Sequence, residues 1–222
     1  MADAIAHPNV FEERISAKFV LGGAIAETMI GVGALVLSIV GLAGFMPIKL
    51  LSIATIGLGA SFIFEGGAVA TRFTHLLSET TEGRLDIAEL GGGLSAEFIA
   101  GLGGITLGIL SLVNVMPAVL TAVAAIMYGG TLVVGVGVKN RLNALRIGQE
   151  EHKIAQEIAR QAVLASSGVQ ILTGLGAVVL GILALLKIEP TILSLVAILS
   201  VSGAMVLGST TIGSRMLSIF RY

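Results

Sequence analysis

The sequence predicts an all-α membrane protein with six transmembrane helices, built as three tandem two-helix hairpins. Three observations predict this fold class. Apolar residues make up 55% of the 222 residues and charged residues only 12%, whereas a soluble domain has about 25% charged residues. Six segments are long and apolar enough to cross roughly 30 Å of hydrocarbon, and a short connection containing a proline joins each consecutive pair. This composition excludes a water-soluble globule.

The six expected spans are the apolar runs between the charged segments, each of about 20 residues. They cover residues 20–45, 48–71, 96–116, 118–138, 169–186 and 191–212. Pro47, Pro117 and Pro190 stand in the short connections. Proline disfavours helix in the residue before it and is tolerated in the first turn of the next helix. Each short connection is therefore predicted as a tight hairpin turn.

The distribution of positive charge predicts the orientation of the spans. Eleven of the 13 Lys and Arg residues lie in the terminal segments and the two long connections, and only Lys49 and Lys187 lie beside the proline turns. Cytoplasmic segments of membrane proteins are enriched in Lys and Arg. We therefore expect both termini and both long connections in the cytoplasm.

One pattern recurs three times along the chain. The stretch GGAIAE at 22–27 aligns with GGLSAE at 92–97, which follows 70 residues later, and a further 73 residues takes Pro117 to Pro190. Repeat units of about residues 10–72, 80–142 and 150–215 thus form a single membrane domain over residues 1–222. Because each unit crosses the membrane twice, all three have one orientation, and a pseudo-threefold axis along the membrane normal should relate them.

Small residues line one face of the first helix of each unit, at spacings of three and four residues. Such a face lets helix backbones approach closely, which is a main source of helix association in lipid. We expect these faces to meet inside the bundle, while Leu, Ile, Val and Phe face lipid. The predicted helix-packing glycines are Gly31, Gly101, Gly104, Gly108, Gly174 and Gly181.

The segments before two of the prolines are closely similar, with GILSLVNVMP at 108–117 and GILALLKIEP at 181–190. In these repeats and its six spans, the chain resembles the HdeD-like family of small bacterial membrane proteins, and the resemblance covers all three hairpins. It implies a protein of the bacterial inner membrane that is associated with acid stress, in a family without an established reaction or catalytic residues. The connections at 72–95 and 139–168 depart from the family, because they are long enough to hold additional helices.

Four polar side chains lie at or inside the predicted membrane boundary. Glu27, Glu97 and Gln170 each stand 20 residues before a proline, which at 1.5 Å per residue is roughly 30 Å from the turns. They should form a polar ring at the cytoplasmic boundary. Glu65 stands 18 residues after Pro47, slightly deeper and on the small face of its helix. The equivalent positions of the other two units hold Gly135 and Gly208.

Two interpretations of these polar residues stay open. An ionisable group in a membrane bundle is by default a functional candidate, here for handling a proton or an ion. Alternatively, the carboxylates cap or anchor helix N-termini, where the macrodipole favours negative charge, and pair with arginines. The candidate charge partners are Arg14, Arg72, Arg84 and Arg215.

The sequence indicates no enzymatic chemistry. The chain has no Cys, and His7, His75 and His152 lie outside the spans. His75 stands close to Glu79 and could form a metal site or a pH-sensing pair with it, but no HExxH or Glu-x-x-His pattern occurs. We expect no catalytic residue, no metal and no cofactor. With 13 basic and 14 acidic residues, the chain has no overall field to attract nucleic acid.

The long connections carry apolar residues at helical spacing. Residues 149–165 are predicted as an amphipathic helix, with shorter candidates at residues 11–20 and 85–90. Such helices either lie along the cytoplasmic membrane surface or dock a protein partner.

Three classes of function follow from these observations. The first is a non-enzymatic inner-membrane protein with a structural or acid-stress-protective role, whose immediate partner is the lipid bilayer. The second is a channel or transporter for protons or a small solute, which needs polar groups near the midplane, where the small faces offer almost none. The third is a scaffold or assembly subunit, acting as a homo-oligomer or within a membrane complex.

Overall fold

The computed structural model consists of six α-helices joined by short turns and longer connections. It describes the backbone of residues 10–79, 87–147 and 153–219, and the side chains of residues 26–66, 96–136 and 167–208. The helices are α1 (Val10–Leu42), α2 (Pro47–Glu79), α3 (Ile87–Leu112), α4 (Pro117–Ile147), α5 (Lys153–Leu185) and α6 (Pro190–Ile219). The all-helical fold class is confirmed, and the three prolines begin α2, α4 and α6 as predicted.

Within the residues whose side chains are described, four of the six helices have a stretch long and apolar enough to cross a membrane. Their apolar stretches are Pro47–Gly66, Pro117–Val136, Ser167–Leu185 and Pro190–Gly208. Helices α1 and α3 contain shorter apolar stretches, Ala26–Leu42 and Ala96–Leu112. Both shorter stretches begin where the described side chains begin.

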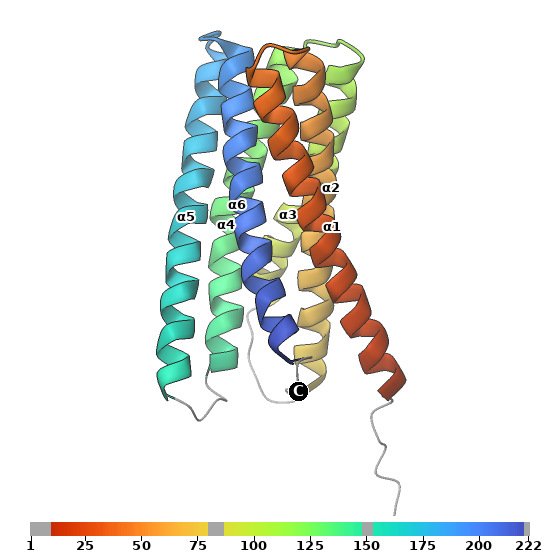
Figure 1. Ribbon diagram of the computed structural model, residues 1–222, viewed down its shortest axis with the longest axis vertical. Helices are drawn as coiled ribbons and strands as arrows, with labels where there is room; N and C mark the ends of the chain where they lie inside the picture. The colour runs from red at the N-terminus through yellow and green to blue at the C-terminus, as the bar shows by residue number, and fades with distance from the viewer. Residues whose placement is uncertain (1–9, 80–86, 148–152, 220–222) are drawn as a thin grey trace, which may run out of the picture.

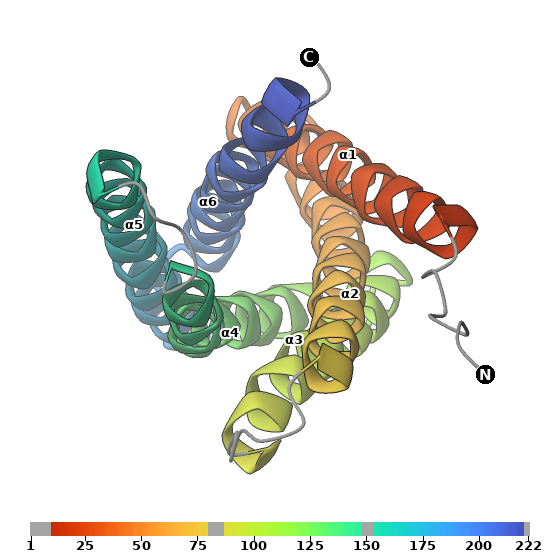
Figure 2. The ribbon, with the colours of Figure 1, turned by 90° about the horizontal axis from the view of Figure 1, so that it is seen from below.

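The helices run side by side along the long axis of the molecule (Figure 1). Seen along that axis, α2, α4 and α6 surround the centre, and α1, α3 and α5 lie outside them (Figure 2). The three inner helices contact one another, and each outer helix packs against two inner ones: α1 against α2 and α6, α3 against α2 and α4, and α5 against α4 and α6. The last helix therefore packs against the first, which closes the bundle into a ring.

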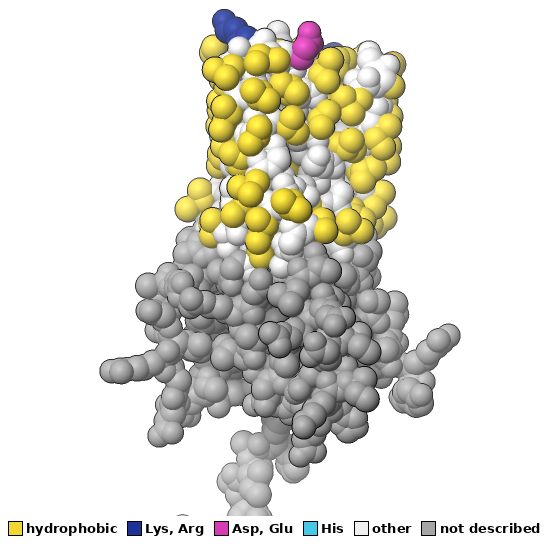
Figure 3. Space-filling view, turned by 90° about the vertical axis from the view of Figure 1, so that its left-hand side faces the viewer, with side chains coloured by type: hydrophobic (Ala, Val, Ile, Leu, Met, Phe, Trp, Pro, Cys, Tyr) yellow, Lys and Arg dark blue, Asp and Glu magenta, His cyan; other side chains and the backbone are white. Residues whose placement is uncertain are grey.

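The centre of the bundle is filled by large side chains of the three inner helices. One buried cluster includes Leu51, Leu58, Phe62, Tyr128, Leu132, Leu195, Ile198, Val201 and Met205, each at most 3% exposed. This differs from the expectation that Leu, Ile, Val and Phe would face lipid. The small faces of the outer helices pack against α2, α4 and α6, and the inner helices use their larger side chains to fill the space between them. Hydrophobic side chains also cover much of the described face seen in Figure 3, and large hydrophobic residues of all six helices are exposed.

Tyr128 of α4 contacts α2 within this cluster through a hydrogen bond and a stacked ring. It is fully buried, and its hydroxyl donates a 2.7 Å hydrogen bond to the backbone carbonyl of Thr55. Its ring stacks on Phe62, with ring centroids 5.0 Å apart and an interplanar angle of 18°. A buried tyrosine hydroxyl needs a hydrogen-bond partner, and the Thr55 carbonyl supplies one.

The three turns have the same hydrogen-bond pattern. Gly44, Asn114 and Lys187 have φ values of 91°, 69° and 65°, and their N–H groups donate to the carbonyls three residues earlier. The next N–H in each turn donates to the carbonyl five residues earlier, which completes a Schellman motif. We call the end of the bundle formed by residues 43–46, 113–116 and 186–189 the turn end. Helix α1 begins and helix α6 ends at the opposite end of the bundle (Figure 1).

The predicted amphipathic helices are not separate elements where the backbone is described. Helix α5 is continuous from Lys153 to Leu185, so most of the 149–165 segment forms its first part. Residues 11–20 likewise belong to α1, and residues 87–90 belong to α3. The segment from Lys153 to Ala165 contains no Pro or Gly and is rich in helix-favouring Ala, Gln and Glu, so nothing interrupts the helix before the apolar span.

Candidate functional site

The predicted polar residues differ in how deeply the bundle buries them. Glu97 on α3 is only 4% exposed, whereas Glu27, Glu65 and Gln170 are half-buried. Counting residues from the prolines favoured Glu65 as the buried carboxylate, but the structure buries Glu97. The difference arises because burial depends on the helices that stand opposite a side chain and not only on its depth along its own helix.

Two glycines make room for the Glu97 side chain between α2 and α4. A Cβ atom added at Gly66 of α2 would lie 3.4 Å from Glu97 Cβ and 3.7 Å from its Oε2. A Cβ at Gly135 of α4 would lie only 2.9 Å from Glu97 Oε1. A larger residue at Gly135 would therefore displace the carboxylate, whereas a Cβ at Gly66 would only contact it.

The same kind of contact recurs between α5 and α6. There Gln170 Nε2 lies 2.8 Å from the place a Cβ of Gly208 would occupy, and both residues follow Glu97 and Gly135 by 73 positions. In the first unit the equivalent residues are Glu27 and Glu65. These helices meet at the same level, because the Ser61 hydroxyl of α2 donates to the Glu27 carbonyl at 3.5 Å.

The other predicted members of the site lie outside the described side chains. These are the candidate charge partners Arg14, Arg72, Arg84 and Arg215, together with His75. Within the described segments, no three or more His, Cys, Asp or Glu side chains gather in a group that could hold a metal ion.

The six predicted packing glycines are all buried at helix contacts. Two of them closely approach the backbone of another helix: a Cβ at Gly101 would lie 2.7 Å from the Gly59 carbonyl, and one at Gly174 would lie 2.6 Å from the Gly129 carbonyl. Gly108 and Gly181 face Ile56 and Ile126 in the same way, with 2.6 Å to the isoleucine Cγ1 in each case. Gly31 of α1 faces Val206 of α6, whose Cγ2 would lie 3.0 Å from an added Cβ.

Gly104 has a different neighbour from the other packing glycines. A Cβ at this position would overlap the hydroxyl and ring edge of Tyr128. The equivalent pairs in the other hairpins are Ala34 with Leu58 and Ala177 with Val201. The second hairpin thus combines a larger residue on its second helix with a smaller one on its first. Sequence reasoning missed Tyr128, although comparison of the three units at this position would have shown the exchange.

A second position shows a related exchange of side chains between different pairs of helices. The hydroxyls of Ser52 on α2 and Ser111 on α3 lie 2.7 Å apart and share a hydrogen bond. The equivalent residues are Ala122 and Ala184 between α4 and α5, and Leu195 and Gly41 between α6 and α1. At the last contact, a Cβ on Gly41 would lie 2.9 Å from Leu195 Cδ2. The contact between α6 and α1 therefore pairs a large residue, Leu195, with a glycine, whereas the contact between α2 and α3 pairs two serines.

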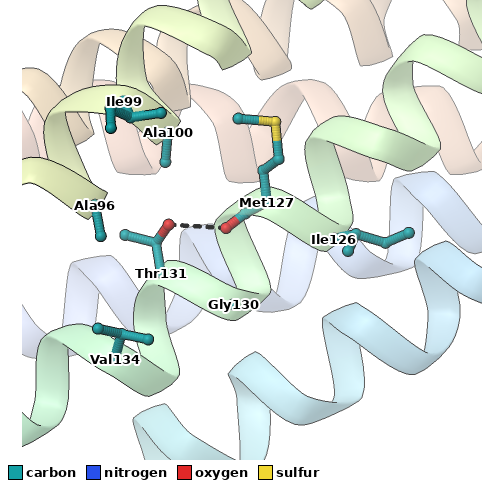
Figure 4. A pocket seen from close by; sticks show the side chains of 8 residues that line it. All are labelled: Ala96, Ile99, Ala100, Ile126, Met127, Gly130, Thr131 and Val134. Atoms are coloured by element: carbon teal, nitrogen blue, oxygen red, sulfur yellow. Dashed lines mark hydrogen bonds between the residues drawn. The ribbon is translucent and has the colours of Figure 1, made fainter.

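An apolar groove lies on the outside of the bundle between α3 and α4 (Figure 4). Its volume is about 260 Å³, and it is lined by Ala96, Ile99, Ala100, Ile126, Met127, Gly130, Thr131 and Val134. The hydroxyl of Thr131 donates to the Met127 carbonyl at 2.8 Å, so it is already engaged within its own helix. This lining offers contact area to an apolar group but no acid, base or nucleophile.

Comparison of the chain with protein-family models, with curated proteins and with solved structures found no match.

Proposed function

We propose that the chain is a non-enzymatic, six-span protein of a bacterial inner membrane with a structural or acid-stress-protective role, as its resemblance to the HdeD-like family implies. The observation that carries this proposal is the filled centre of the bundle. Leu58, Phe62, Tyr128 and Val201 are at most 1% exposed and belong to one cluster of the inner helices. A conductor needs a hydrated path lined by polar groups, and a close-packed apolar centre favours a role based on the folded bundle itself.

The proposed architecture is three tandem hairpins around a pseudo-threefold axis. The recurrence of contacts at the repeat spacing supports it: Gly59 with Gly101 and Gly129 with Gly174 are equivalent pairs. Ser202, whose carbonyl oxygen would lie 3.8 Å from a Cβ at Gly31, occupies the corresponding place between the last and first helices. The three Schellman turns also support it. With eleven of the 13 Lys and Arg residues in the terminal segments and long connections and not beside the turns, both termini are assigned to the cytoplasm.

Glu97 favours a second candidate function, the handling of protons or a small solute. A carboxylate that is 4% exposed and enclosed by glycines of two other helices is costly to place in a membrane bundle, and such residues commonly have a function. In this alternative, Glu97 would gain and lose a proton at the level of Gly66 and Gly135. At the equivalent position of α5, the uncharged side chain of Gln170 lies beside Gly208 as Glu97 lies beside Gly135, so this position does not require a charge.

Outward-facing glycines favour a third candidate, assembly with further helices as a homo-oligomer or membrane-complex subunit. Gly33, Gly130, Gly176 and Gly203 have open space where a Cβ would lie. They therefore contribute no close contact within the chain. Small residues on an outer face allow another membrane helix to approach.

Survival of bacterial cells during acid challenge tests the first proposal against the second. Cells would express the wild-type chain, Glu97→Gln, or Gly101→Leu, whose side chain would collide with Ile63 and the Gly59 backbone. A structural role predicts that wild type and Glu97→Gln protect equally and that Gly101→Leu does not. Loss of protection in Glu97→Gln, with normal membrane levels and an unchanged thermal midpoint, would favour the carboxylate mechanism. If wild type gives no protection, the acid-stress role is wrong.

A further inference from the structure

The turn end exposes large apolar side chains in all three turns. Val113 is 70% exposed, Met116 is 68% exposed and Leu186 is 65% exposed, and Phe45 in the first turn is also exposed. Segments that connect helices in water are normally polar, because exposed apolar area is unfavourable there. These four residues therefore indicate that something other than bulk water surrounds the turns.

The turn geometry explains only part of this pattern. A Schellman motif commonly has an apolar residue directly after the left-handed position, which accounts for Phe45, Val115 and Ile188. It gives no reason for Val113 and Leu186, which precede that position, or for Met116, which precedes the proline. The exposed apolar side chains at these three places therefore need an explanation outside the turn geometry.

The charges at the turn end are few and mainly positive. Among the described residues 43–50, 113–120 and 186–193, the charged side chains are Lys49, Lys187 and Glu189, and all three are exposed. In the view of Figure 3, hydrophobic side chains cover the described surface up to the turn end, where the charged groups stand. Two cations beside an apolar rim are complementary in charge to the phosphates at a bilayer surface, and lysine can extend its stem along apolar surface to reach them.

We propose that the three turns lie within the headgroup layer of the bilayer, with their apolar side chains at the acyl boundary and Lys49 and Lys187 against lipid phosphates. This inference rests on the membrane placement proposed above. The turns then form an interfacial surface that fixes the depth of the bundle in the membrane. The spans behind them, such as Pro117–Val136 with 20 residues, are long enough to cross roughly 30 Å of hydrocarbon.

Tryptophan fluorescence in vesicles tests the proposal. The wild-type chain has no Trp, so each single-Trp variant reports only from the introduced residue. Phe45→Trp places the probe in the first turn, and Val36→Trp places it on the outer surface of α1, where Val36 is exposed. Each variant is reconstituted into phosphatidylcholine and phosphatidylglycerol brominated either near the headgroup or near the chain centre. Since about 15 Å separates these depths, Phe45→Trp should be quenched about twofold more strongly by the shallow bromines, and Val36→Trp by the deep ones.

The possible outcomes separate this proposal from the membrane placement. Quenching of Val36→Trp by deep bromines, together with acrylamide but no bromine quenching of Phe45→Trp, would overturn the interfacial position and leave the spans in place. No bromine quenching of either probe would overturn both. Protection of Phe45→Trp from acrylamide and bromines alike would mean that protein, a second copy or a partner, covers the turns, and this would also overturn the proposal.

Paired lysine variants test the phosphate contacts. Adding phosphatidylglycerol to the purified protein should raise the thermal midpoint of wild type and of Lys49→Arg/Lys187→Arg by similar amounts. The rise should be smaller in Lys49→Gln/Lys187→Gln, because those side chains carry no charge. An equal rise in all three proteins would contradict the assignment of the two lysines to lipid phosphate.

Discussion

Gly104→Ala would place a methyl group where the hydroxyl and ring edge of Tyr128 lie, so the two residues cannot both keep their positions. Tyr128 has little freedom to move away. It is fully buried and stacked on Phe62, and its hydroxyl is bonded to the Thr55 carbonyl. A change of one methyl group in α3 therefore disturbs the contact between α4 and α2.

The size of the effect follows from three contributions. Forcing an extra methyl group into a packed core costs about 1–3 kcal/mol, and weakening the Tyr128 hydrogen bond costs about 0.5–1.5 kcal/mol. Alanine is favoured over glycine within a helix by about 0.5–1 kcal/mol, which offsets part of this cost. We expect Gly104→Ala to lower the free energy of unfolding by about 2 kcal/mol.

The other hairpins suggest a compensating change. Gly104→Ala with Tyr128→Leu would recreate the pair Ala34 and Leu58 of the first hairpin. The double variant should therefore be more stable than the sum of the two single effects predicts, with a coupling of about 1 kcal/mol. Unfolding of the purified protein by sodium dodecyl sulfate in mixed micelles, followed by circular dichroism, measures all four proteins of the cycle.

Gly176→Ala is the matched control. Gly176 lies on the helix equivalent to α3 in the third hairpin, and its added Cβ would meet open space. This variant should be neutral, or more stable by up to about 1 kcal/mol. Equal destabilisation by Gly104→Ala and Gly176→Ala, or additive effects of Gly104→Ala and Tyr128→Leu, would refute the reasoning about this contact.

Two further predictions concern the turns and the serine contact. Lys187 has φ 65° in a position that favours glycine, so Lys187→Gly should stabilise the protein by up to about 1 kcal/mol. Gly44 has φ 91° in the equivalent position, so Gly44→Ala should destabilise it by about 1 kcal/mol. The same unfolding titration measures both variants, and effects of the same sign would contradict the turn geometry. Ser111→Ala removes the hydrogen bond between the Ser111 and Ser52 hydroxyls, while Ser52 still donates to the Ile48 carbonyl, and should cost about 1 kcal/mol. Ser52→Ala/Ser111→Ala reproduces the Ala122 and Ala184 pair and should lie within about 0.5 kcal/mol of wild type. A double variant less stable than Ser111→Ala would contradict the equivalence of these two contacts.

The helices and turns were predictable from the sequence because their determinants are local. Proline cannot continue a helix and fits its first turn, so Pro47, Pro117 and Pro190 predicted where α2, α4 and α6 begin. Long apolar runs predicted helices of membrane-spanning character. The spacing of Gly101, Gly108, Gly174 and Gly181 indicated close helix contacts, since residues three and four apart share one face.

The burial of individual side chains was not predictable in this way, because it depends on pairs of helices. Glu97 is buried by Gly66 and Gly135, which belong to α2 and α4, and no count along α3 reveals this. Tyr128 resembles any aromatic residue of an apolar span until α2 and α3 are placed beside it. Which helices are inner and which are outer likewise follows from their mutual packing. Hydropathy does not distinguish them, because the apolar stretches of the outer helix α5 and the inner helix α6 have the same mean hydropathy.

Proton flux through the purified protein in sealed vesicles tests the central claim, that the bundle is packed and does not conduct. Vesicles containing wild type, Glu97→Gln or Glu65→Gln would carry an internal pH-sensitive dye, and the external pH would be stepped from 7 to 5, with protein-free vesicles as control. We predict that all three proteins leave the rate of acidification at the protein-free value. A faster rate with wild type that falls to the protein-free value in Glu97→Gln, while Glu65→Gln stays fast, would contradict the claim and identify Glu97 as part of a proton path.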